Sequence, residues 1–175
     1  MELDVESSDL DALTGLSNRR RFFELAAAAF EHARATGAEC TAVLIDLDRL
    51  DFVNDTFGHH TGTELIRETG AALGEIASPG DVLGRIGGDE FALLRVGAAT
   101  SKEELWWQIS TAAKHGSGAN KPFALGVSVG VAVARADEVA SFDSLMALAD
   151  DSMYEHKLAG GGSDGPPHAR RRPRD

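Results

Sequence analysis

The unbroken run at residues 41–45, Thr-Ala-Val-Leu-Ile, places the tightest limit on what this chain can fold into. A strand with one wet face alternates apolar and polar residues, whereas a run without alternation is typical of a strand covered on both faces. We therefore expect a central strand in a sheet that carries helices on both sides. The run ends in Asp46 and Asp48, so two carboxylates should lie at the carboxyl end of this strand.

Helical spacing of apolar residues predicts four helices around this strand. Steps of three and four residues bring apolar side chains onto one face of a helix. The first helix can be capped by Ser17 and Asn18 and should end near Gly37, and the last should end near Lys157. The four apolar stripes lie within residues 22–33, 65–76, 105–113 and 142–153.

Two further patterns predict the rest of the sheet. Apolar runs at 82–86 and 91–96 flank residues 87–90, Gly-Gly-Asp-Glu. Such runs joined by Gly-Gly predict a β-hairpin, because the tight primed turns need positive φ at both central positions. Residues 123–134 alternate with period two, and small residues fill one side, so another element can pack closely there. The expected fold is an α/β, or α+β, sandwich: a central mixed sheet of about five strands covered by helices.

Length and charge limit the number of domains and the classes of partner. A chain of 175 residues with 43% hydrophobic residues suits one compact domain, which we place at residues 9–160. We expect a flexible lead at 1–8 and a disordered Gly-, Pro- and Arg-rich tail at 161–175. The net charge of −11 disfavours nucleic-acid binding. No apolar run approaches the ~20 residues of a membrane span, and the N-terminus is unlike a signal peptide, so we expect a cytoplasmic protein.

Two pairs of acidic residues carry the chemistry that the sequence suggests. Asp46 and Asp48 follow the buried strand, and Asp89 and Glu90 follow two glycines at the hairpin tip. Either pair alone could simply be solvated. Glycine N–H groups can approach an anion while a neighbouring carboxylate holds a hard cation, and a phosphate with Mg²⁺ needs both. If the hairpin lies beside the strand, carboxylates from both elements could share metal ions that neutralise a triphosphate.

The string at residues 87–91, Gly-Gly-Asp-Glu-Phe, resembles the motif that names the GGDEF, or diguanylate cyclase, family. Other segments resemble this family in the same order along the chain, and together they cover about residues 9–160. They are the opening segment at 11–20, the metal strand at 45–48, the nucleotide-binding turn at 54–59, a later strand at 128–132 and the final helix at 149–157.

The resemblance implies a palm-like fold, as in the catalytic domains of nucleotidyl cyclases, and a bacterial signalling enzyme. The reaction would join two GTP molecules into cyclic di-GMP and release pyrophosphate. Each protomer of a homodimer would hold one GTP, so that each ribose 3′-oxygen attacks the α-phosphorus of the opposite nucleotide. The cofactor would be Mg²⁺ or Mn²⁺, two ions per active site. The short acidic lead before Asp9 suggests that a sensory or dimerising domain was once attached upstream. It is equally consistent with Met1 as the natural start of the chain.

Carried over position by position, the resemblance assigns roles to individual residues. Asp46 and Asp89 would be metal ligands, together with the carbonyl of Leu47. Glu90 would bind metal or help to deprotonate the attacking hydroxyl. The substrate contacts would come from main-chain N–H groups of Arg49, Leu50 and Asp51, from Gly87 and Gly88 beside the phosphates, from Asn54 at the guanine edge, and from Lys157 at a phosphate. Without the resemblance, Lys157 reads equally well as a solvent-facing lysine at a helix end.

Two departures from the family pattern remove positive charge near the phosphates. Leu50 and Asp51 stand where the family usually has Phe-Lys, so an anion replaces a cation. Gly161 stands where an arginine normally follows the lysine of the final helix. Both changes should weaken triphosphate binding, because each charge-assisted contact contributes ~1.5–3 kcal/mol.

Two other departures concern base choice and feedback. Thr63 stands where the family usually has an aspartate that pairs with guanine. In having a small hydroxyl residue here, the chain is similar to a minority of the family that tolerates adenine. Asp81 is the remnant of an Arg-x-x-Asp product-binding inhibitory site, with Ser78 in place of the arginine. Three functions therefore stay open: an active diguanylate cyclase, a degenerate domain that binds nucleotide or dimerises, and a cyclase with relaxed base choice that also takes ATP and makes cyclic GMP-AMP.

Overall fold

The computed structural model describes residues 9–97, 101–116 and 126–158. The lead at 1–8, residues 123–125 of the expected last strand, and the tail at 161–175 lie outside the described residues. No helix in the described part of the chain is long and apolar enough to cross a membrane. The elements, in chain order, are α1 (Arg19–Thr36), β1 (Glu39–Asp48), α2 (Leu50–Phe57), α3 (His59–Ile76), β2 (Val82–Arg85), β3 (Glu90–Val96), α4 (Lys102–Gly116), β4 (Gly126–Arg135) and α5 (Phe142–Leu158).

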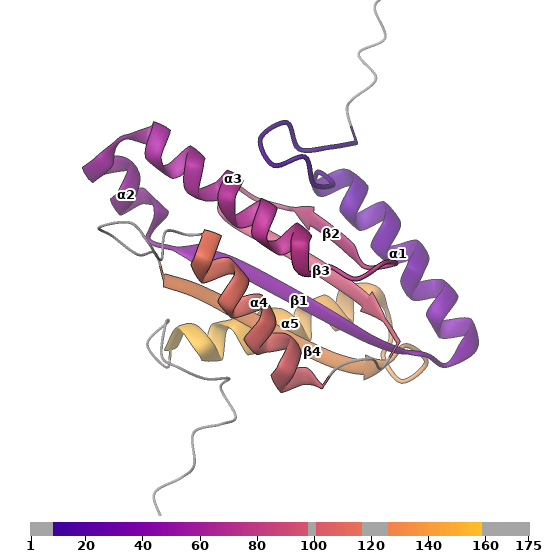
Figure 1. Ribbon diagram of the computed structural model, residues 1–175. Helices are drawn as coiled ribbons and strands as arrows, with labels where there is room; N and C mark the ends of the chain where they lie inside the picture. Colours follow the sequence, from indigo (N-terminus) through magenta and orange to yellow (C-terminus); the bar gives the residue numbers. More distant parts are fainter. Residues whose placement is uncertain (1–8, 98–100, 117–125, 159–175) are drawn as a thin grey trace, which may run out of the picture.

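The strands form one sheet with the order β2-β3-β1-β4, and β1 lies between β3 and β4 (Figure 1). The sandwich class is confirmed, but the expectation of a mixed sheet of about five strands is wrong for the described residues. They contain four strands, and every neighbouring pair is antiparallel. The sheet is not mixed because strands that run in the same direction are not neighbours. β3 lies between β1 and β2, and β1 lies between β3 and β4.

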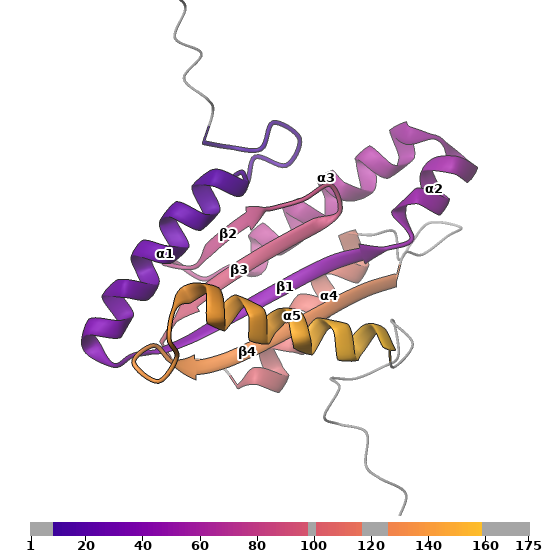
Figure 2. The ribbon, with the colours of Figure 1, turned by 180° about the vertical axis from the view of Figure 1, so that it is seen from behind.

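Helices cover both faces of the sheet, as the run in β1 predicted. α3 and α4 lie on the face seen in Figure 1, and α1 and α5 lie on the face seen in Figure 2. Ile45 belongs to the core beneath α3 and α4, whereas its neighbour Leu44 packs with α1 and α5. Because side chains alternate along a strand, Asp46 projects on the same face as Leu44. The acidic end of β1 is therefore on the α1/α5 side.

β4 and α5 approach each other closely at Gly130, which confirms the expected small-residue face. A Cβ atom at Gly130 would lie 2.6 Å from the Cβ of Met153 and would also collide with the carbonyl of Ala149. Only glycine leaves room for the helix at this position. The contact fixes α5 against the sheet and brings its last turn toward the carboxyl end of β1.

α1 begins and ends where the sequence predicted. The side chain of Asn18 accepts a hydrogen bond from the N–H of Arg21, and Gly37 ends the helix with a φ of 66°. A left-handed residue at a helix end favours glycine, because other side chains are strained there. The start of α1 thus lies next to the hairpin, where Arg19 donates a 3.0 Å hydrogen bond to the carbonyl of Ile86.

Candidate functional site

The two acidic pairs lie on neighbouring strands, as expected. Asp46 of β1 is directly opposite Glu90 of β3 in the antiparallel register. The N–H of Leu47 donates a 3.0 Å hydrogen bond to the carbonyl of Asp89, so the backbones remain paired into the turn. Asp46 and Asp89, which are 43 positions apart in the chain, are thereby held together at the same end of the sheet.

The hairpin itself is confirmed, but its turn is not the primed type that Gly-Gly suggested. Neither Gly87 nor Gly88 has a positive φ. The N–H groups of Ile86 and Gly87 both donate to the carbonyl of Glu90, at 2.9 and 3.3 Å. A Cβ at Gly87 would lie 2.5 Å from the Oε2 of Glu90, whereas a Cβ at Gly88 would meet nothing within 4 Å. Gly87 thus makes room for the Glu90 carboxylate, and Gly88 leaves the tip of the turn open.

Negative charge accumulates around this turn. Burial, followed by the charge of Asp46, raises the pKa of Asp89 above its ordinary value. Burial, followed by the charges of Asp46 and Asp89, also raises the pKa of Glu90. Burial first, and repulsion between the carboxylates second, disfavour the charged forms of Asp89 and Glu90, so the arrangement favours binding of positive charge.

Lys157 of α5 supplies one positive charge to the site. Its Nζ donates a 2.7 Å hydrogen bond to Oδ2 of Asp46. Burial opposes the charged form of Lys157, but the hydrogen bond with Asp46 and the charges of Asp46, Asp48 and Asp89 outweigh it and raise the lysine pKa. The last turn of α5 therefore belongs to the site, and Lys157 is not merely a solvated helix end.

A divalent cation would have a limited set of protein ligands here. In the described part of the chain, no three His, Cys, Asp or Glu side chains converge closely enough to form a metal group by themselves. Asp48 is already engaged, because the hydroxyl of Ser128 donates to both of its oxygens at 2.8 and 2.9 Å. The set of metal ligands that the family resemblance implies, Asp46, Asp89 and the carbonyl of Leu47, therefore stays a prediction. Hard oxygen ligands suit Mg²⁺, which keeps other positions for water and phosphate.

The sequence did not predict the short helix α2, which begins directly after the acidic strand. Arg49 has a φ of 61°, an uncommon left-handed value for a residue other than glycine, and it turns the chain from β1 into the helix. Its carbonyl accepts from the N–H groups of Phe52 and Val53 at 3.1 and 3.4 Å. The first N–H groups of a helix have no internal partner and can face an anion. The buried pair Leu50 and Val53, three residues apart, was the missed signal.

The two residues expected at the base, Asn54 and Thr63, belong to the consecutive helices α2 and α3. The Asn54 side chain lies directly against Gly62, where a Cβ would be 3.0 Å from the Asn54 Cγ. Thr63, the next residue, donates its hydroxyl hydrogen to the carbonyl of His59 at 2.9 Å. The Thr63 oxygen can therefore accept a hydrogen bond, while its proton is already used within the helix.

Asp81 is part of a buried ion pair that the sequence did not reveal. The guanidinium of Arg95 contacts it at 2.6 Å, and the two side chains are only 7% and 3% exposed. Arg95 also donates to the hydroxyl of Ser78 at 3.1 Å, and Asp81 accepts from the N–H of Ser78 at 2.8 Å. The one signal was a charged residue inside the apolar run of β3. Asp81 thus holds the β2/β3 hairpin together.

The opening segment holds the turn from outside, a role that reasoning from the residues alone missed. The carboxylate of Asp11 accepts from the N–H and hydroxyl of Thr14 at 2.9 and 2.8 Å and from Arg85 at 3.1 Å. Arg85 also donates a 2.8 Å hydrogen bond to the carbonyl of Gly88. The chain just before α1 is therefore linked, through one guanidinium, to the tip of the hairpin.

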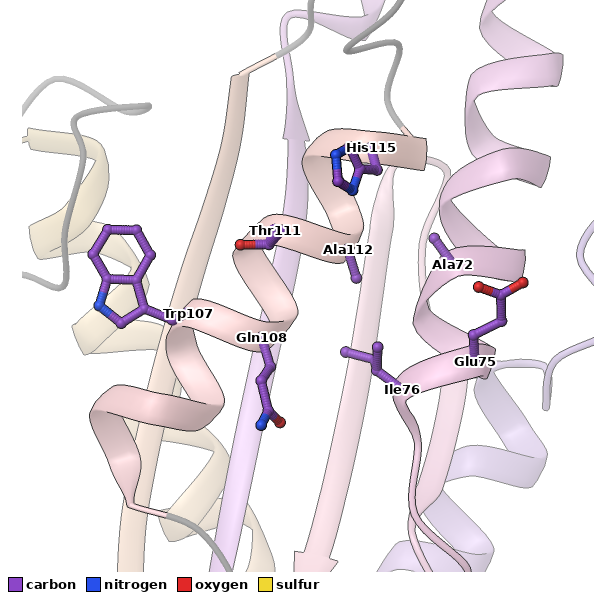
Figure 3. Close-up of a pocket in the computed structure, with 8 residues that line it drawn as sticks. All are labelled: Ala72, Glu75, Ile76, Trp107, Gln108, Thr111, Ala112 and His115. Carbon is purple, nitrogen blue, oxygen red and sulfur yellow. The ribbon is translucent and has the colours of Figure 1, made fainter.

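A separate groove of about 500 Å³ lies between α3 and α4. Figure 3 shows its lining, with Ala72, Glu75 and Ile76 on α3 and the other labelled side chains on α4. None of the residues expected at the site lines this groove. The charged groups around Asp46, rather than the larger cavity, therefore mark the candidate site.

Comparisons with known proteins show the family of this chain. The family model described as "Diguanylate cyclase, GGDEF domain" matches residues 8–163. Diguanylate cyclase DgcP of Escherichia coli strain K12 is 32% identical over 158 residues, which are 87% of this chain and 46% of that protein. The chain therefore spans less than half the length of this relative.

Solved structures show the same fold. One match is the GGDEF domain of DgcB from Caulobacter crescentus in complex with c-di-GMP, with a TM-score of 0.76 at 26% identity. This match covers 93% of this chain and 97% of the DgcB chain. A sensory box/GGDEF family protein from Caulobacter crescentus CB15 has a TM-score of 0.73 at 30% identity, with coverages of 87% and 100%. The likeness extends over nearly the whole described fold.

Proposed function

Because the chain belongs to the GGDEF family of diguanylate cyclase domains, we propose that it condenses two GTP molecules into cyclic di-GMP and pyrophosphate. The observation that carries this proposal is the pairing of Asp46 with Glu90 beside Asp89, in a position where their charges favour a cation. An idle domain has little physical need for Asp46, Asp89 and Glu90 together at one end of a strand pair, where burial and neighbouring charge raise the pKa of Asp89 and Glu90. The direct test is incubation with GTP, ATP or both, plus Mg²⁺ or Mn²⁺, and identification of products by mass.

Each residue has a defined task in the proposed reaction. Asp46, Asp89 and the carbonyl of Leu47 would hold the metal ions, which supply neutralisation of the triphosphate charge when bound. The open tip at Gly88 and the first N–H groups of α2 would receive phosphate oxygens. Lys157 would exchange its hydrogen bond to Asp46 for a phosphate contact once a metal ion compensates the carboxylate.

Glu90 is the group that would take the proton from the attacking 3′-hydroxyl. Its raised pKa makes the carboxylate a better proton acceptor than an ordinary solvated glutamate. The side chain fits against Gly87, so its position is fixed by the turn rather than by a flexible loop. A fixed acceptor beside the metal ligands can serve a hydroxyl group that arrives from the opposite protomer.

The proposed chemistry requires two protomers, so specific activity should depend on protein concentration. Each protomer would hold one nucleotide, and an isolated protomer offers no second nucleotide for attack. We expect specific activity to fall on dilution below the dimer dissociation constant, measured for the same sample by analytical ultracentrifugation. Constant specific activity across that transition would exclude the half-site arrangement.

A cyclase with relaxed base choice is the second candidate, and Thr63 favours it. The hydroxyl hydrogen is committed to His59, so the side chain offers guanine one neutral acceptor instead of a carboxylate. We predict that Thr63→Asp raises GTP affinity and GTP-over-ATP selectivity by up to ~1–3 kcal/mol, as for hydrogen bonds to a charged partner. Calorimetry with both nucleotides measures this.

Thr61→Asp is the matched control for that substitution. Like Thr63, Thr61 donates its hydroxyl hydrogen to a carbonyl of the preceding turn, that of Phe57 at 2.9 Å. Thr61 precedes Gly62 in α3, whereas Thr63 follows it. The same charge placed there should leave base selectivity unchanged. Equal effects of the two substitutions would mean that Thr63 acts through net charge and does not face the base.

The third candidate, a domain that binds nucleotide weakly or only dimerises, draws on Asp51. This carboxylate lies in the first turn of α2, and its charge adds to the raised pKa of Asp89. It therefore opposes a triphosphate where a cation would attract one. In all three cases the partners are GTP or ATP and a second protomer, and a sensory domain elsewhere in a longer protein would supply the input.

A further inference from the structure

A second cavity, of about 350 Å³, lies between α1, α5 and the hairpin. Figure 2 shows this face of the sheet, which both α1 and α5 cover. Phe23 of α1 and Met146 and Met153 of α5 supply apolar walls, and Glu90 lines the end nearest the candidate site. Its volume falls within the range of sites that hold small molecules.

The charged groups of this cavity are unpaired and of both signs. Arg19 lies 5.1 Å above the Phe23 ring and reaches the carbonyl of Ile86. Asp143 and Asp150 line the opposite wall, on one face of α5. Within residues 9–97, 101–116 and 126–158, none of these three charged side chains forms an ion pair. The cavity thus presents guanidinium donors on one side and carboxylate acceptors on the other.

We infer that this cavity binds a guanine base, with the attached phosphate groups outside it. Guanine offers two N–H groups to a carboxylate and, at O6 and N7, two acceptors to an arginine. Adenine presents no edge with two donors for a carboxylate. The planar ring would lie between aromatic and methionine walls, as bases do in nucleic-acid-binding proteins. Three lining carboxylates against one guanidinium would repel a phosphate from the interior.

Two guanine ligands could reach the cavity, the substrate GTP and the product cyclic di-GMP, and in naming them this inference rests on the proposed function. An occupant would touch Glu90, the residue assigned to the proton of the attacking hydroxyl. Binding of the product would therefore slow the reaction directly. Such feedback would act at a surface different from Asp81, which is occupied by Arg95.

The test measures binding of guanosine and adenosine by calorimetry, with chelator present so that turnover and metal play no part. Ala147→Phe fills the cavity from an exposed helix position, so the fold should tolerate it. We expect guanosine to bind at least about tenfold more tightly than adenosine, and Ala147→Phe to abolish the difference. Asp150→Asn should weaken guanosine at least about tenfold. Asp151→Asn, an exposed neighbour outside the lining, should not.

Asn54→Ala separates this cavity from the base site proposed on α2 and α3. Guanosine binding that survives Asn54→Ala and disappears in Ala147→Phe supports the inference, and the opposite pattern overturns it. Equal affinity for guanosine and adenosine, or no guanosine binding at millimolar concentration, also overturns it. Separate titrations with cyclic di-GMP and GTP identify the source. Product formation from GTP with Mg²⁺, measured on the same protein preparations without chelator, tests the proposed function independently.

Discussion

Asp46→Asn should lower the rate of cyclic dinucleotide formation by about a hundredfold to a thousandfold, the usual cost of losing one fixed electrostatic contact to a transition state. The substitution keeps the shape of the side chain but removes the charge that would hold the metal ion. It also removes the ionic partner of Lys157. The amount of product formed per unit time, measured over a range of Mg²⁺ concentrations, gives the rate. Circular dichroism checks that the fold remains.

Asp48→Asn is the matched control at the same end of β1. Its carboxylate is bound by the Ser128 hydroxyl, so we expect a much smaller loss of rate. Equal losses in both variants would mean that negative charge at this strand end matters only in general. Wild-type activity in Asp46→Asn would contradict the proposed metal site.

Asp81→Asn should lower the free energy of unfolding by about 3 kcal/mol, because it leaves the buried Arg95 guanidinium without its counter-charge. Urea unfolding with linear extrapolation measures the change. The double variant Asp81→Asn with Arg95→Met should recover part of it, since removal of both charges leaves neither unpaired. Asp137→Asn breaks an exposed pair with Arg135 and should change stability little.

A loss no larger than that of Asp137→Asn would mean that water reaches the Arg95 pair. The outcome also bears on feedback. If Asp81 is needed for stability, as its 3% exposure implies, it is unsuited to bind product, and cyclic di-GMP affinity should not depend on it in variants that remain folded.

Local patterns predicted the parts of the fold that depend on neighbours in sequence. The Asn18 cap and the Gly37 end of α1 follow from the backbone needs of a helix. The unbroken run at 41–45 correctly indicated a strand covered on both faces, because it lacks a polar side. The strand count and directions were wrong, since periodicity carries no information about which strands become neighbours.

The expected proximity of the two acidic pairs is confirmed, but reasoning from the residues alone missed the contacts that surround them. Resemblance assigned a role to Lys157, but its contact with Asp46 joins residues 111 positions apart, which no local pattern encodes. The turn type was wrong for a related reason. Gly87 is needed because the Glu90 side chain folds back against it, not because the backbone requires positive φ. A glycine has both uses, and only three-dimensional packing distinguishes them.

β1 completes its pairing late during synthesis. Both of its neighbours are later in the chain, because Asp46 pairs with Glu90 of β3 and Glu39 pairs with Arg135 of β4. Until then the nascent chain exposes a strand of high β-propensity with both edges open, the kind of segment that joins other chains. The central position that fixes the two carboxylates therefore makes the growing chain prone to aggregation until β4 has left the ribosome.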